Sequence, residues 1–153
     1  MSIPSSTIKI LLEDSEIRQE VLEDAQRFSD LLLLMISTYY TPRERGHEFV
    51  SAFENRLSFN DRIELFRTLP FKPRPKAFEC LKTVKAVQRV RNYIAHPNMI
   101  VGKKTLDGVQ EIAFLFSDFP KSYREAVKKA NRQIYKIGGL KETMRFHLRG
   151  NDA

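Results

Sequence analysis

The sequence predicts a mainly α-helical bundle of four to five helices, with a small β-hairpin in its second half. Apolar residues recur every three or four positions through long stretches of the 153-residue chain, which is the spacing of one helical face. Prolines and a Gly-Gly pair interrupt these stretches and separate the helices. One segment, residues 98–116, departs from helical spacing and contains the hairpin turn signal Asp107-Gly108.

The first strong helical pattern covers residues 15–40. Residues 1–14 are expected to form a loose lead-in, in which Ile8 to Leu12 could pack as a short strand or turn. Ser15 is a favourable N-cap, and Glu16 complements the helix dipole in the first turn. We expect this helix to be central. Its inward positions are Ile17, Val21, Phe28, Leu32, Met35 and Tyr39.

Two shorter helices are expected between residues 42 and 69. Pro42 stops the first helix and occupies the N1 position of the second. After a brief interruption at residues 58–60, a short amphipathic helix ends near Leu69. Residues 69–75 contain three prolines and two cations, which indicates a stiff, extended connector. The alternative interpretation of this connector is a proline-rich ligand segment.

A helix beginning near Lys76 is predicted to end at Ala95. Pro97 disfavours helical geometry at His96, so the helix should stop there. Arg91 falls on the same face as the apolar residues, where a charge is costly unless it is paired or the site opens to solvent. We expect this helix and the helix over 15–40 to form the core pair. The apolar stripe consists of Phe78, Leu81, Val84, Val87, Val90 and Ile94.

The remaining elements follow the His96-Pro97 break. Residues 99–101 and 109–116 are predicted to form the two strands of the hairpin, although the second could instead be a buried helical turn. Asp118-Phe119-Pro120 opens a further helix, which Gly138-Gly139 ends. Residues 140–149 are expected to form a short final helix.

Length and composition indicate one domain spanning residues 1–153, in the cytoplasm. The lone cysteine, Cys80, lies on a core-facing position, so we expect a structural thiol, no internal disulfide and a reducing compartment. The N-terminus lacks a basic region followed by a long apolar run, so no signal peptide is expected. The longest strictly apolar run, from Leu31 to Ile36, is too short to cross a bilayer, so no membrane partner is expected.

The charge of the chain is unevenly distributed. Residues 1–40 contain three basic and seven acidic side chains, whereas residues 41–153 contain 23 basic and 12 acidic ones. A basic body favours an acidic partner, of which nucleic acid is the commonest, but a solvated cationic surface remains an equal alternative. The residues predicted to contact nucleic acid are Lys72, Arg74, Lys76, Lys82, Lys85 and Arg89.

The end of the helix before Pro97 contains the sequence Arg91-Asn92-x-x-Ala95-His96. It resembles the signature of the HEPN superfamily, small helical bundles of which many are ribonucleases. The resemblance rests on six residues and implies a metal-independent endoribonuclease that works as a homodimer, with two motifs across one cleft. It also implies a toxin–antitoxin or defence setting, with an antitoxin as protein partner. By this resemblance His96 is the acid/base, Arg91 the phosphate clamp, and Asn92 a residue that orients the helix end or contacts the scissile phosphate.

The same three residue types suit RNA cleavage by the ribose 2′-hydroxyl. That reaction needs a base, an acid and a cation that stabilises the crowded phosphate. Histidine titrates near neutrality, and arginine bonds phosphate oxygens bidentately. No metal or other cofactor is expected, since the three histidines and single cysteine lack ligand spacing, and no Gly-rich phosphate loop follows a strand.

A noncatalytic interpretation of the motif remains open. Asn92 and His96 could cap free carbonyls at the helix end. Arg91 could pair with an acidic residue of the first long helix. The chain would then be a HEPN-like module that binds nucleic acid or a protein partner without cutting it. The acidic candidates for this pairing are Glu20, Glu23 and Asp24.

Overall fold

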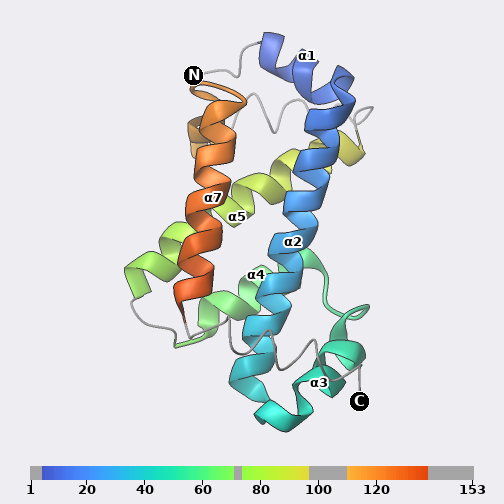
Figure 1. The fold of residues 1–153 in the computed structure, drawn as a ribbon, viewed down its shortest axis with the longest axis vertical. Helices are drawn as coiled ribbons and strands as arrows, with labels where there is room; N and C mark the ends of the chain where they lie inside the picture. Colours follow the sequence, from blue (N-terminus) through green and yellow to red (C-terminus); the bar gives the residue numbers. More distant parts are fainter. Residues whose placement is uncertain (1–4, 71–73, 97–109, 138–153) are drawn as a thin grey trace. The chain divides into compact units, whose positions relative to one another are not determined.

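The structure is a computed structural model that describes residues 5–70, 74–96 and 110–137. Within these ranges the chain is mainly α-helical, as predicted, and no strand is present (Figure 1). None of the helices in these ranges is both long and apolar enough to cross a membrane. The elements are α1 (Ser5–Glu13), α2 (Ser15–Tyr40), η1 (Arg43–Arg45), α3 (Gly46–Phe53), α4 (Phe59–Thr68), α5 (Arg74–Ala95), η2 (Gln110–Phe116) and α7 (Lys121–Lys136), where η is a 3-10 helix.

The helices group into two compact units. The first unit comprises residues 1–26 and 82–130, and the second comprises residues 27–81 and 131–153. The boundaries fall inside α2, α5 and α7, so each of these helices contributes one part to each unit. The expectation of a single domain over the whole chain stays a prediction.

The first unit is built around the N-terminal part of α2, the C-terminal part of α5 and the N-terminal part of α7. Tyr123 is buried on α7, and its hydroxyl donates to the Asp24 carboxylate on α2 at 2.9 Å. A buried carboxylate therefore has a hydrogen-bond donor, which removes much of the cost of its burial. At the surface Arg124 donates to both carboxylate oxygens of Glu20, at 2.8 and 2.9 Å. The apolar core of this unit includes Leu11, Val21, Val84, Val87, Val90, Ile94, Leu115 and Val127.

The second unit buries most of α2 between Phe28 and Ser37, whereas Tyr39, predicted to point inward, is 50% exposed. Every residue from Leu31 to Ser37 is buried, which agrees with the prediction that this helix is central. The Ser37 hydroxyl donates to the Gly46 carbonyl at 3.2 Å, which ties α2 to the start of α3. The side chains that α4, α5 and α7 bury in this unit include Ile63, Phe66, Cys80, Leu81 and Ile134, and Ile137 is buried just after α7.

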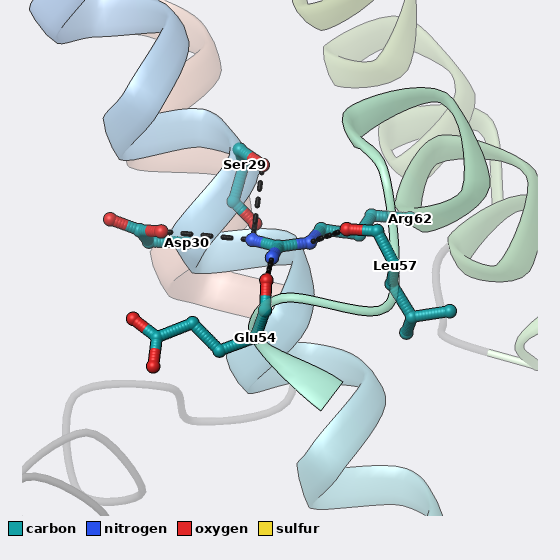
Figure 2. A network of polar contacts seen from close by, with 5 residues as sticks. All are labelled: Ser29, Asp30, Glu54, Leu57 and Arg62. Carbon is teal, nitrogen blue, oxygen red and sulfur yellow. Dashed lines mark hydrogen bonds and ion pairs between the residues drawn. The ribbon is translucent and has the colours of Figure 1, made fainter. Parts of the chain in front are cut away.

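A buried arginine joins three segments of the second unit (Figure 2). Arg62 of α4 is 4% exposed, and its guanidinium donates to the carbonyls of Leu57 at 3.0 Å and Glu54 at 2.7 Å. It also donates to the carbonyl and the hydroxyl of Ser29 on α2, both at 3.0 Å. Asp30 lies 3.7 Å away as an exposed counter-charge. The fixed fork of donors thus holds the loop after α3 and the start of α4 against α2.

The start of α4 is a capping box. The Ser58 hydroxyl accepts from the Asp61 backbone N–H at 3.1 Å, and the Ser58 N–H donates to the Asp61 carboxylate at 2.9 Å. These bonds satisfy N–H groups that a helix N-terminus otherwise leaves free. The hydrogen bonds from Ser58 also lower the pKa of the Asp61 carboxyl below its usual value of 3.8.

The N-terminal lead-in was wrongly predicted. Residues 5–13 form α1, so the described residues hold six α-helices rather than the predicted four to five. The break before α2 is a helix cap at Asp14, whose side chain accepts from the N–H groups of Glu16 and Ile17 at 3.0 and 3.1 Å. Asp14 therefore takes the N-cap role assigned to Ser15. The helical phase of α1 shows in its buried positions, Thr7 and Leu11, which are four residues apart.

The second predicted strand of the hairpin is also wrong. Residues 110–116 form the 3-10 helix η2, which corresponds to the helical-turn alternative. Its buried residues are Ile112, Leu115 and Phe116. The step of three from Ile112 to Leu115 matches the period of a 3-10 helix and not the alternation of a strand. The predicted strand over 99–101 and the predicted final helix over 140–149 lie outside the described residues.

Candidate nucleic-acid interface

The helix α5 ends where the sequence predicted, at Ala95. The backbone N–H of His96 still donates to the Asn92 carbonyl at 3.1 Å, so His96 continues the hydrogen-bond pattern of the last turn. The side chains of both residues are exposed. The imidazole of His96 and the amide of Asn92 are therefore accessible to a ligand at this end of the helix.

The side chain of Arg91 is exposed, although the sequence placed it on the apolar face of the helix. Helix geometry places it about 40° from Val87, on the apolar side as predicted. In the last turn, however, burial shifts to Val90, Tyr93 and Ile94, while the other side faces solvent. The site thus opens to water, which removes the cost of a buried charge. Phe78, also assigned to the stripe, is likewise 46% exposed.

The guanidinium of Arg91 is held by its neighbour in the sequence. One of its N–H groups donates to the Asn92 side-chain oxygen at 3.0 Å. The acidic partners proposed for it on α2 bond to other residues: Glu20 to Arg124, Glu23 to Gln19 and Asp24 to Tyr123. Among the described residues Arg91 forms no ion pair with these carboxylates.

The position of each residue around the α5 axis decides which residues share a face. Asn92 lies about 40° from the direction of His96, whereas Arg91 lies about 140° from it. Arg91 and His96 therefore do not share a face, and Asn92 stands between them. Between Lys82 and His96, five residues lie within about 40° of the His96 direction, and Phe78, earlier on the helix, has the same direction. The set of five, called here the α5 outer face, is Lys82, Lys85, Arg89, Asn92 and His96, all of them exposed or half-buried.

The α5 outer face is cationic. The sequence contains no Asp or Glu between Glu79 and Asp107, so no acidic residue of α5 interrupts it beyond Glu79. The ammonium group of Lys82 lies 4.9 Å from the centre of the Phe114 ring in η2. This cation–π contact holds one end of the face against the protein while leaving the residue exposed.

The other predicted nucleic-acid residues are placed less completely. Lys72 lies outside the described residues. Arg74 and Lys76 lie in the first turn of α5, where the structure describes only their backbone. The sequence shows a positive charge over residues 41–153, but its share on α7 was not assigned to a face. On α7 every basic side chain is exposed, and the i, i+4 spacing was the signal: Lys121, Arg124, Lys128, Lys129, Arg132 and Lys136.

In the part of the chain that the structure describes, no side chains are arranged for metal binding or for catalysis by a thiol. No group of three or more His, Cys, Asp or Glu side chains in these residues is arranged to hold a metal ion. Cys80 is fully buried, and burial raises the pKa of its thiol to about 12. A thiol with that pKa stays protonated at neutral pH and is not a nucleophile.

Comparison with protein-family models, curated proteins and solved structures finds no match for this chain. Its function is therefore argued from its own residues. Those residues form an exposed Arg–Asn–His cluster at the end of α5 and a cationic helix face that leads to it.

Proposed function

We propose that this chain is a metal-independent endoribonuclease of the HEPN type that acts on single-stranded RNA. The observation that carries the proposal is the exposure of Arg91, Asn92 and His96 together at one helix end. Residues with a purely structural role at a helix end are expected to turn their polar groups to the free carbonyls. Here the Arg91 guanidinium bonds the Asn92 side chain instead, and all three side chains remain accessible to a ligand.

In this proposal His96 moves the protons and Arg91 carries the charge. The imidazole takes the proton of the attacking 2′-hydroxyl or returns one to the departing 5′ oxygen. The guanidinium bonds the non-bridging phosphate oxygens as negative charge builds up on them. Asn92 fixes the position of the Arg91 guanidinium and lies on the side of the helix that faces His96.

The separation of Arg91 and His96 around the α5 axis favours a homodimer. One histidine cannot be base and acid at once in a single concerted step, and its arginine points about 140° away. A second copy of the chain would bring its own Arg91 and His96 to the opposite side of the phosphate. We place this activity in the cytoplasm, in a toxin–antitoxin or defence setting where an antitoxin covers the exposed cluster until release.

The test is cleavage of single-stranded RNA in the presence of EDTA. The expected products end in 2′,3′-cyclic phosphate, and DNA is spared because it lacks the attacking hydroxyl. His96→Gln should lower the cleavage rate by at least about 100-fold, the usual contribution of a general acid or base. His47→Gln, which changes a histidine of α3, is the matched control and should cut like the original protein. Equal cleavage by His96→Gln, or no cleavage by the unmodified chain, would overturn the proposal.

A noncatalytic nucleic-acid-binding module is the second candidate. The cationic α5 outer face favours it, because that face needs no chemistry to bind phosphates. Binding of RNA without cleavage, with His96→Gln binding equally well, would select this candidate. Both candidate functions fail if the chain binds a protein partner and the amount of RNA that it retains does not change with salt concentration.

A further inference from the structure

The five residues of the α5 outer face form a straight line along the helix. Their spacing alternates between three and four positions, from Lys82 to Lys85, Arg89, Asn92 and His96. Side chains at this spacing lie one above the next on an α-helix. The line is about 21 Å long, because its ends are 14 residues apart at 1.5 Å per residue. It belongs entirely to the first unit.

The chemistry of the line suits a row of phosphates. Its first three members are cations, and its last two are an amide and an imidazole, which donate hydrogen bonds to phosphate oxygens. Between Lys82 and His96 the line contains no apolar side chain, and Phe78, which extends it by one turn, is a single exposed ring. A helix that lies in a membrane surface needs a whole apolar face to insert. The apolar face of this part of α5 is already used, since Val84, Val87 and Val90 are buried.

We infer that the α5 outer face binds the sugar–phosphate backbone of an RNA single strand that runs along the helix from Lys82 to His96. The position of the cut at the His96 end rests on the proposed function, but binding along the face does not. Because His96 is the last residue of the line, all these contacts fall on one side of the scissile bond.

Arg89, and not Arg91, is the arginine of this track. Arg89 lies about 20° from the direction of His96, whereas Arg91 lies about 140° away. Two arginines that are two positions apart thus have different tasks: Arg89 binds the strand ahead of the cut, and Arg91 acts at the cut through its bond to Asn92. Sequence proximity alone does not separate these tasks.

Binding is tested with a 12-nucleotide single strand of 2′-O-methyl RNA, which cannot be cut because its 2′-hydroxyls are blocked. The variant is Lys82→Ala/Lys85→Ala/Arg89→Ala, measured by fluorescence anisotropy over a range of salt concentrations. The control is Lys121→Ala/Lys128→Ala/Arg132→Ala, which removes the same charge from exposed positions of α7. Alanine favours helix at all six positions, and an unfolding curve of each protein confirms its fold.

The α5 variant should bind at least about tenfold more weakly, and its salt slope should fall by about 2, since each single-strand phosphate contact contributes about 0.7. The control should lose less than about threefold. Equal losses in the two variants would show a net-charge effect and overturn the inference, as would unchanged binding by the α5 variant. Binding of the unmodified chain to phosphatidylserine vesicles but not to the RNA would overturn it too.

Cleavage then tests where the track ends. Two RNAs with a single preferred cut, one extended by six nucleotides on the 5′ side and one on the 3′ side, should differ in kcat/KM by at least about tenfold. Equal values would overturn the placement of the cut at the His96 end. If the unmodified chain cuts neither RNA while the α5 variant still loses binding, the ribonuclease proposal fails and the track remains.

Discussion

Arg62→Met should destabilise the chain by about 3–5 kcal/mol, because it leaves several buried hydrogen-bond acceptors without their donor. Methionine is long and apolar enough to fill much of the space of the arginine side chain, so the loss is mainly that of the guanidinium and its hydrogen bonds. Two of the acceptors, the carbonyls of Glu54 and Leu57, lie in the loop between α3 and α4. Backbone carbonyls cannot be exchanged for apolar groups, so the variant leaves them short of a donor.

The magnitude follows from the four hydrogen bonds of the guanidinium, which are 2.7 to 3.0 Å long. A buried polar group left without a partner costs about 1–3 kcal/mol. The total is less than four such costs, because some of these acceptors bind water instead or already accept a hydrogen bond within a helix. The ion pair to Asp30 adds little, because that carboxylate is 57% exposed and 3.7 Å away. Burial lowers the pKa of Arg62, but an arginine side chain stays charged at any ordinary pH.

The assay is urea unfolding followed by circular dichroism, with the slope of the free energy against urea concentration compared between variants. The control is Arg67→Met, on the same helix, which removes an exposed arginine that lies 3.5 Å from Glu64. It should cost less than about 1 kcal/mol, as exposed ion pairs do. If Arg62→Met lies within about 1 kcal/mol of the unmodified protein, the network shown in Figure 2 does not hold these segments together.

Four further outcomes are expected. Tyr123→Phe removes the donor from the buried Asp24 carboxylate and should cost about 1–3 kcal/mol in the same urea assay; an unchanged midpoint would contradict that contact. Ser58→Ala should cost about 1 kcal/mol at neutral pH by removing the cap of α4. Because the folded pKa of Asp61 is lowered, its contribution is present above pH 3.8 and is lost as the pH falls through the folded value, so unfolding curves of Asp61→Asn and the original should converge in acid. Iodoacetamide should label Cys80 only in denaturant, and rapid labelling of the native protein would show that the thiol is not buried.

The sequence by itself determined the helical class and most helix ends. Periodic apolar residues and proline breaks located α2, α4, α5 and α7, because the period and the breakers are local properties of the chain. Pro97 correctly marked the end of α5 at Ala95. The same reasoning missed α1, where the buried positions within nine residues are few, and it mistook a period of three in η2 for the alternation of a strand.

The candidate site divides in the same way. Residue types and spacing identified Arg91, Asn92 and His96, and helix phase alone puts Lys85, Arg89 and His96 on one line. Only the tertiary structure decided that Arg91 is exposed, since burial depends on which distant residues cover a given side of the helix.

The burial of Arg62, by contrast, could not be predicted from the sequence. It belongs to a short amphipathic helix of ordinary composition, and nothing near it in the sequence marks it as buried. Its burial requires acceptors on α2, 33 residues earlier in the chain. Sequence periodicity determines which faces of a helix differ, whereas the fold decides what each face meets, because contacts join residues that the chain keeps far apart.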